Sequence, residues 1–205
     1  EKYRLFVDKI INDYSIESVL DIGCHTGHIL DEFKLKNLNT YFTEYEDEDL
    51  LSFVSQKGHK YIRGGFYPNT KLNFDLIYLG DVIEHVDFPN QMMEIISKNL
   101  QNKNQYLYIN TPNFNSIERI LLGNKYNIFS YPEHLTYFTV RSLNRFIESY
   151  GYKKIYAFSD NISIIRIFQF FKLGLKKKKI SQAKNQEKEI LVNFFDDYEE
   201  IINKS

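Results

Sequence analysis

The sequence predicts an α/β protein with a mostly parallel sheet of six or seven strands and helices on both faces of the sheet. Short apolar runs of strand length alternate with segments in which apolar residues recur every three or four positions. This alternation indicates a parallel sheet, because each connection between neighbouring parallel strands needs a crossover, usually a helix. A glycine-rich turn follows the first predicted strand, at the edge where such sheets bind their ligands.

The first part of the chain is predicted to contain three helices and three strands. An amphipathic helix opens it, because apolar residues between Tyr3 and Tyr14 fall at helical spacing. A second helix presents Ile29, Leu30 and Phe33, and a third is ended by Gly58. The predicted strands cover residues 18–22, 39–44 and, more weakly, 60–62, and the third helix covers residues 47–57.

The second part continues the alternation. Asp87 is expected to cap a helix that has Pro89 in its first turn. Thr139 is expected to cap a later helix, which Gly151 ends. The strands predicted here cover residues 74–80, 105–110 and 153–158.

The segment after Ser159 allows two interpretations. Residues 162–168 form a seventh strand, or they begin a basic amphipathic helix that continues to Lys179. Residues 186–204 are predicted to form a further helix, because apolar residues fall on one of its sides: Ile190, Leu191, Phe194, Phe195, Tyr198 and Ile201.

Composition narrows the class of protein. A chain of 205 residues, 43% of them hydrophobic, can bury the core of one globular domain. The formal net charge of −1 provides no general attraction to nucleic acid, so none is expected as a partner. Cys24 is the only cysteine, so no internal disulfide can form. This suits a reducing compartment, and because no signal peptide or membrane-spanning run is visible, we expect a cytoplasmic protein.

The loop after the first strand has the composition of a ligand-binding turn. Gly23 and Gly27 let the backbone turn sharply and approach a ligand, and the next helix presents free N–H groups there. A dinucleotide site would have the pattern G-x-G-x-x-G, but His25 and His28 stand where further glycines are expected. Asp21 would repel a diphosphate and suits a cationic ligand. An NAD-dependent oxidoreductase therefore fits the sheet but not the loop.

Glu44 is a candidate for binding a ribose. It stands at the end of the predicted second strand, 23 positions after Asp21, where a carboxylate can accept hydrogen bonds from both ribose hydroxyls. The alternative is a solvated loop carboxylate, since residues 46–49 are also acidic. The place of Glu44 at the strand end favours the ribose.

Several segments together resemble the successive motifs of class I S-adenosylmethionine (SAM)-dependent methyltransferases. The closest resemblance is to the small-molecule branch, which includes ubiquinone-biosynthesis and sugar O-methyltransferases. The resemblance rests on residues 19–27, Glu44 and residues 74–85, and is extended by residues 108–113 and 132–146. It implies a Rossmann-like fold with SAM as donor and S-adenosylhomocysteine (SAH) as product. Residues 1–160 would be the SAM-binding methyltransferase domain, and residues 161–205 a strand or helical extension of it.

The resemblance also implies which residues bind SAM. The glycine-containing loop would line the methionine end of the cofactor, and Glu44 would hold its ribose. The sequence departs from the family at His25, where glycine is common, and around residues 63–66, where no acidic adenine-contacting residue is evident. The implied cofactor-binding residues are Asp21, Gly23, Cys24, His25, Gly27, Glu44, Tyr45, Leu79, Gly80 and Asp81.

Two histidines and one carboxylate are the candidates for catalysis. Methyl transfer from a sulfonium is a one-step displacement, so much of the catalysis is the alignment of donor and acceptor. A hydroxyl acceptor also benefits from a base, and histidine changes protonation near neutral pH. His134 is the leading candidate because Pro132 and the irregular segment before it indicate a loop. His85 comes second and Asp81 third, and either histidine can instead serve only to shape the pocket.

A metal site is the alternative use of the same residues. Two carboxylates and two histidines can bind a divalent cation. Here they resemble the metal site of small-RNA terminal 2′-O-methyltransferases, in which the metal holds the acceptor hydroxyls. The same histidines occur in metal-free relatives, and the net charge does not favour RNA. A metal-assisted enzyme for RNA ends is therefore a second interpretation, and a non-catalytic SAM-binding homologue a third. The four metal candidates are Asp81, Glu84, His85 and His134.

The preferred interpretation is an enzyme that methylates a small-molecule hydroxyl, such as that of a sugar or surface-glycan precursor. Residues 113–138 form an insert with many aromatic residues and a predicted helix ending at Gly123. We expect this insert to cover the acceptor pocket, or to be a satellite packing cluster. Residues 164–179 end in four lysines; a solvated helix end is favoured over contact with an anionic membrane. The sequence leaves the oligomeric state open.

Overall fold

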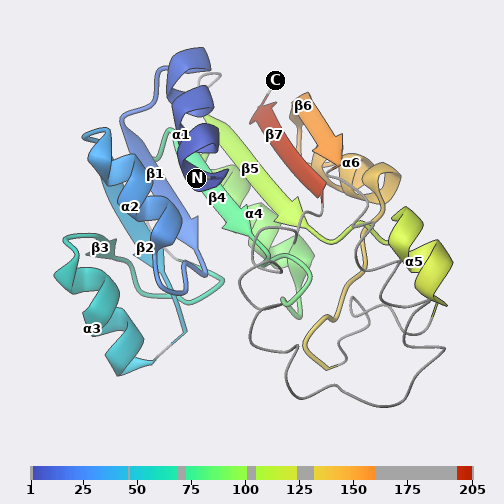
Figure 1. The fold of residues 1–205 in the computed structure, drawn as a ribbon, viewed down its shortest axis with the longest axis horizontal. Helices are drawn as coiled ribbons and strands as arrows, with labels where there is room; N and C mark the ends of the chain where they lie inside the picture. The colour runs from blue at the N-terminus through green and yellow to red at the C-terminus, as the bar shows by residue number, and fades with distance from the viewer. Residues whose placement is uncertain are drawn as a thin grey trace, which may run out of the picture.

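A computed structural model describes residues 2–45, 47–68, 73–100, 105–123, 132–159 and 198–204. Its seven strands form one sheet in the order β3-β2-β1-β4-β5-β7-β6 (Figure 1). The register shows that β7 runs antiparallel to both of its neighbours, while the other six strands run parallel. The strands are β1 (Ser18–Ile22), β2 (Asn39–Thr43), β3 (Lys60–Tyr61), β4 (Leu76–Gly80), β5 (Tyr106–Thr111), β6 (Tyr152–Ser159) and β7 (Tyr198–Lys204).

Helices cover both faces of this sheet, as the sequence predicts. The first three pack on one face, and α4 and α6 pack on the other. The short helix α5 lies in the predicted insert and ends at the expected place, before Gly123. The helices are α1 (Lys2–Asp13), α2 (His28–Leu35), α3 (Glu48–Gln56), α4 (Pro89–Asn99), α5 (Ile117–Leu122) and α6 (Val140–Glu148).

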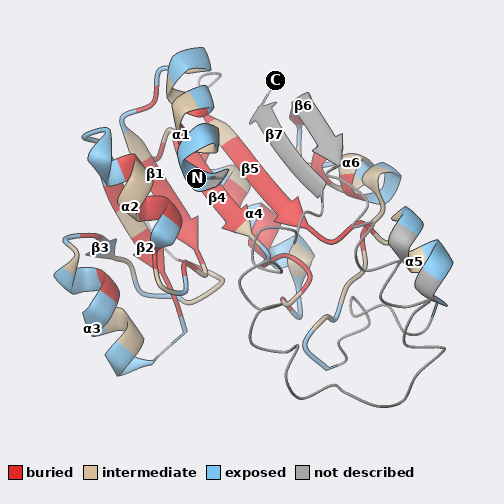
Figure 2. Cartoon of the chain, viewed as in Figure 1, coloured by how far each residue is buried: buried red, intermediate tan, exposed pale blue. Residues whose placement is uncertain are grey.

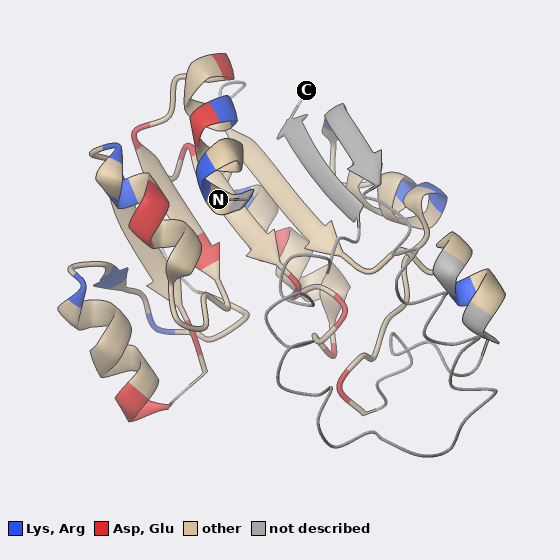
Figure 3. Ribbon diagram, in the orientation of Figure 1, with Lys and Arg blue, Asp and Glu red and all other residues tan. Residues whose placement is uncertain are grey.

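The central strands are buried on both faces (Figure 2). Alternate residues of one strand therefore belong to different cores: Ile77 and Leu79 face α4 and α6, whereas Leu76 and Tyr78 face α1 and α2. This double burial explains why the sequence of β4 shows no alternation of apolar and polar residues. Charged residues are mostly on helices and loops rather than on strands (Figure 3). No helix in the described part of the chain is long and apolar enough to cross a membrane.

One of the two predicted N-cap residues is confirmed by the structure. Thr139 accepts a hydrogen bond from the Ser142 N–H at 3.0 Å, and the Ser142 hydroxyl accepts one in return from the Thr139 N–H, which confirms the predicted cap as a capping box. The predicted cap by Asp87 is wrong, because Phe88 occupies the N-cap position and makes no side-chain cap bond. Pro89 stands at the start of α4 as expected and needs no hydrogen-bond acceptor there, since proline has no N–H.

The structure of residues 198–204 differs from the prediction. Residues 198–204 form strand β7, not the end of the helix predicted over residues 186–204. The strand fills the space between β5 and β6 and hydrogen-bonds to both, which satisfies backbone groups that two separated strands would leave open. Helical spacing of apolar residues cannot detect such a vacant position in a sheet. The strand or helix predicted from residue 162, the basic segment 164–179 and residues 186–197 all lie outside the described residues.

Two leucines of α2 test how this helix packs. Leu30 is fully buried against the α1 side of the sheet, whereas Leu35 is 75% exposed. Leu30→Ala should therefore lower the free energy of unfolding by about 2–5 kcal/mol, because it leaves a cavity. Leu35→Ala, the matched control on the same helix, should change it by less than about 0.5 kcal/mol. Urea unfolding measures both, and equal losses would contradict the packing of α2.

Candidate functional site

The turn between β1 and α2 has a tightly constrained backbone. Gly23, His25 and Gly27 have left-handed φ values of 73°, 49° and 72°. A Cβ atom at Gly23 would lie 2.9 Å from side-chain carbons of both Phe66 and Val82. Only glycine fits at this position, because a side chain would meet both conformational strain and these neighbours. The turn therefore lies in direct contact with the segments that follow β3 and β4.

The end of β2 holds this turn in place. The Thr43 carbonyl accepts hydrogen bonds from the N–H groups of Gly23 at 3.0 Å and Cys24 at 3.2 Å. The Glu44 carboxylate accepts from the N–H of His25 at 2.6 Å and from that of Tyr45 at 2.8 Å. The His25 side chain is exposed, so His25 contributes to the turn through its backbone N–H, which donates to Glu44. The left-handed conformation of a non-glycine residue is thus compensated by a charge-assisted hydrogen bond.

Two acidic side chains give this region its electrostatic character. Asp21 is only 3% exposed, and its burial, followed by repulsion from Glu44, raises the pKa of this carboxyl well above its ordinary value. Burial likewise raises the pKa of the Cys24 thiol, and both carboxyl groups add to the effect. Cys24 is therefore a neutral, small apolar group here and not a nucleophile. A positively charged ligand would relieve the repulsion between Asp21 and Glu44.

The end of β4 lies beside this turn. Residue Asp21 of β1 pairs in register with Tyr78 of β4, and the strand continues through buried Leu79 to Gly80. Asp81 then adopts a left-handed φ of 55°. Its N–H donates to the Asn110 carbonyl at 3.0 Å, and its carboxylate accepts from the Asn110 side-chain amide at 2.9 Å. Residues 79–81 therefore lie next to the β1–α2 turn, and the end of β5 holds Asp81 there.

His85 and His134 meet across two loops. Their ring centroids are 4.6 Å apart in an edge-to-face arrangement. The His85 Nδ1 lies 2.8 Å from the Glu133 carbonyl oxygen. Because a carbonyl can only accept, Nδ1 is the donor, and in the neutral ring Nε2 then carries the lone pair. The sequence places these histidines 49 positions apart, and the structure brings them together.

The Glu84 carboxylate lies close to both histidines. It is 2% exposed, and its carboxylate accepts a hydrogen bond from the Thr111 hydroxyl at 3.0 Å. One ligand atom each from Glu84, His85 and His134 all lie within 4.8 Å of one another. Asp81 does not belong to this group, so the structure assembles three of the four predicted metal candidates. The Glu84 carbonyl also accepts hydrogen bonds from the backbone N–H groups of residues 135 and 136, at 2.7 and 3.1 Å. This attaches the His134 loop to the loop after β4.

The site thus has two chemically distinct parts. The β1–α2 turn with Asp21 and Glu44 favours a cationic ligand that has hydrogen-bonding hydroxyls. The group of Glu84, His85 and His134 can take up a proton or bind a divalent cation. Sequence reasoning named both parts but missed three contributions, because they depend on tertiary contacts: the Phe66 ring against Gly23, the Glu133 carbonyl on His85, and the Thr111 hydroxyl on Glu84.

Solved structures share this architecture. Magnesium protoporphyrin IX methyltransferase from Synechocystis, solved with bound SAH, has a TM-score of 0.67 at 9% identity, covering 100% of this chain and 82% of that one. A SAM-dependent methyltransferase from Thermotoga maritima, a possible histamine N-methyltransferase, has a TM-score of 0.58 at 19% identity, covering 75% and 72%. The methyltransferase domain of bacterial CtHen1-C has a TM-score of 0.62 at 12% identity, covering 100% and 97%. At these identities the similarity shows the fold.

The sequence itself identifies the family. No curated protein matches it significantly. Residues 2–157, well over half of the chain, match the family model described as a methyltransferase domain. The match contains every element from α1 to the greater part of β6, and with them the turn, Glu44 and the histidine pair. The chain belongs to the methyltransferase domain family and is a class I methyltransferase whose cofactor is SAM.

Proposed function

We propose that the protein transfers the methyl group of SAM to a hydroxyl of a small molecule, such as a sugar or surface-glycan precursor. The observation that carries this proposal is the contact between His85 and His134 at the carboxyl end of β4. An imidazole there can take the proton that a hydroxyl must lose when it is methylated. The His134 loop, which is part of the predicted insert, lies at this position, and its backbone hydrogen-bonds to the Glu84 carbonyl.

We assign the donor site to the β1–α2 turn and the strand ends beside it. The sulfonium and ammonium groups of SAM are cations, which suits the buried Asp21 and the neighbouring Glu44. Each Glu44 oxygen accepts one backbone N–H and retains lone pairs for a ribose hydroxyl. Tyr45 is 59% exposed, and its ring packs edge-on against Phe66 with centroids 4.6 Å apart. These two rings offer an apolar surface to the adenine.

We assign the base to His134 and a positioning role to His85. Bound SAM would supply an electrophilic methyl group, whose bond to sulfur would break as the acceptor oxygen bonds to its carbon, with SAH as the neutral thioether product. The acceptor proton passes to the His134 imidazole. His85, held by the Glu133 carbonyl, orients His134 through the ring contact, and Asp81 can hold the acceptor in line with the donor.

The proposal is tested by offering labelled SAM with a panel of sugars, sugar nucleotides and phenols, and measuring labelled product. With the acceptor found, His134→Ala should reduce kcat at least about 100-fold, the usual contribution of a general base, while SAH affinity is retained. Leu135→Ala, an exposed neighbour in the same loop, is the matched control and should keep its kcat. Full activity of His134→Ala would refute its role as base. SAH binding without transfer to any acceptor would favour the non-catalytic interpretation.

The role of Glu44 is tested by removing its charge. Glu44→Gln should raise the Kd of SAH about tenfold, because an amide cannot accept both backbone hydrogen bonds and loses the charge-assisted contact. Calorimetric titration with SAH measures the change. Glu48→Gln, an exposed position at the start of α3, should leave the affinity unaltered. Equal affinities for the two variants would show that Glu44 does not contribute to the donor site.

A second candidate function is metal-assisted 2′-O-methylation of RNA ends. It is favoured by the convergence of one carboxylate and two imidazoles within 4.8 Å, a donor set that suits a divalent cation. The existing hydrogen bond on the His85 Nδ1 fits this use as well, since it leaves Nε2 for the metal. Glu84, His85 and His134 would hold the ion, which when bound polarises the acceptor hydroxyl.

Chelation separates the two candidates. If a metal holds the acceptor, then excess EDTA should abolish transfer, and magnesium or manganese added in excess should restore it. SAH affinity should not change, because the proposed ligands lie outside the donor site. Capped and uncapped RNA ends belong in the acceptor panel for this test. Transfer that is indifferent to EDTA would eliminate the metal and leave the histidine base.

A further inference from the structure

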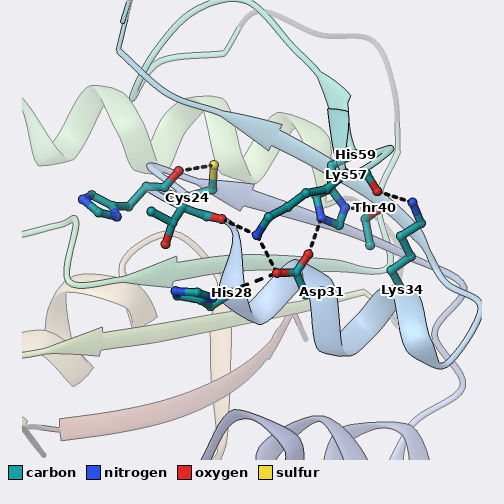
Figure 4. Close-up of polar contacts among 9 residues, drawn as sticks. Cys24, His28, Asp31, Lys34, Thr40, Lys57 and His59 are labelled. Atoms are coloured by element: carbon teal, nitrogen blue, oxygen red, sulfur yellow. Dashed lines mark hydrogen bonds and ion pairs between the residues drawn. The ribbon is translucent and has the colours of Figure 1, made fainter. Parts of the chain in front are cut away.

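The side chain of Lys57, the residue that follows α3, contacts the β1–α2 turn. The Lys57 Nζ lies 2.9 Å from the carbonyl oxygen of Thr26 and 2.6 Å from Oδ2 of Asp31 (Figure 4). Lys57 directly follows α3 in the chain, and its side chain is 24% exposed. It therefore connects the turn, helix α2 and the end of α3 through one ammonium group that is mostly shielded from water.

Asp31 is held from a second direction. Its Oδ1 lies 3.0 Å from Nε2 of His59, whose side chain is fully buried, and the His59 Nδ1 lies 2.7 Å from the Thr40 hydroxyl. Because a carboxylate can only accept, Nε2 donates, and Nδ1 of a neutral ring can accept from Thr40. Asp31 is thus placed by β2 and by the residue before β3, independently of Lys57 (Figure 4).

The Asp31 carboxyl is charged at neutral pH. Its partial burial acts to raise the pKa, but the hydrogen bonds from Lys57 and His59 outweigh this effect and hold the pKa of Asp31 below its ordinary value. The Lys57 ammonium also lies 4.8 Å from the ring centroid of Phe53, within range of a cation–π contact. The ammonium position is consequently defined by three separate groups.

The turn has contacts on two sides. On the β2 side, Thr43 and Glu44 hold its N–H groups. On the α3 side, Lys57 holds the carbonyl of Thr26, which lies between the left-handed residues His25 and Gly27. The peptide that carries this carbonyl contains the Gly27 N–H. Its orientation determines how the turn enters α2 and where the first N–H groups of the helix point.

We propose that Lys57, aligned by Asp31, is a positioning residue for SAM binding that sets the conformation of the turn without touching the cofactor. These contacts join the turn to α2 and to the end of α3 within the protein itself, so Lys57 lowers the cost of ordering the turn when SAM binds. This proposal concerns the donor site alone and does not depend on the acceptor or on a metal.

The test compares substitutions of lysine in two ion pairs. Lys57→Met keeps the length of the side chain but removes its charge, and it should raise the Kd of SAH about tenfold, the scale of one charged hydrogen bond. Lys57→Arg, which can still reach both oxygens, should restore most of the affinity. Lys9→Met removes a similar pair, Lys9 with Asp13 at 2.7 Å on α1, and should leave the Kd unchanged. Calorimetry gives each Kd, and thermal unfolding gives each Tm.

The two readouts separate positioning from stability. A lower Tm of Lys57→Met with an unchanged Kd would overturn the proposal, as would equal Kd values for Lys57→Met and Lys9→Met. Asp31→Asn is the second variant if Lys57→Met does not fold, and it should weaken SAH binding in the same direction. Unchanged affinity of a folded Asp31→Asn would also overturn the proposal. Failure of the unsubstituted protein to bind SAH would instead contradict the donor-site assignment.

Discussion

The turn between β1 and α2 is the constraint on which the site depends. Its backbone must leave the sheet, reverse through left-handed conformations and enter a helix within five residues, while Gly23 lies against side chains from two other loops. A turn of this kind cannot be stable by itself, since its N–H groups need acceptors. The end of β2 supplies them through the Thr43 carbonyl and the carboxylate of the next residue, Glu44, so the proposed donor site is built by two adjacent strands together.

The sheet order then decides where the chemistry can take place. Strands β1, β4 and β5 are neighbours and parallel, so their carboxyl ends open on one edge. The acidic residues lie at β1 and β2, and the histidine pair lies beyond β4. In the proposed reaction a cation becomes a neutral thioether on the first side, and a proton is taken up on the second. Asp21 and Glu44 thus lie where the positive charge of the donor would be held, and the two imidazoles lie where the proton would be taken up.

Both loops of the site are attached at their backbones rather than by packing alone. The Glu84 carbonyl holds the His134 loop, and the Glu133 carbonyl holds the His85 ring. The β1–α2 turn is held in the same manner by Thr43 and by Lys57. Such directional contacts define the angle of a peptide group or imidazole ring, which apolar contacts do not, and alignment is the main requirement of a direct displacement.

The sequence by itself determined the strand and helix alternation, the glycines of the turn and the acidic residue at the end of β2. These are local properties, since apolar spacing and glycine conformation act over a few residues. Prediction from the sequence failed where a structure depends on contacts with residues that are distant in the chain. Residues 198–204 have helical spacing but are a strand, because β5 and β6 leave a space for them. Asp87 has the chemistry of a cap, yet α4 begins one residue too late for it.

Only the tertiary structure decided which candidate residues lie close together. It assembled Glu84, His85 and His134, and it tied Asp81 to Asn110 instead. It also brought Lys57 to the turn, although nothing in the sequence around this lysine distinguishes it from a solvated one. The physical reason is the same in each case. A hydrogen bond between groups tens of residues apart depends on how strands are ordered in the sheet, and that order is set by the packing of the whole domain.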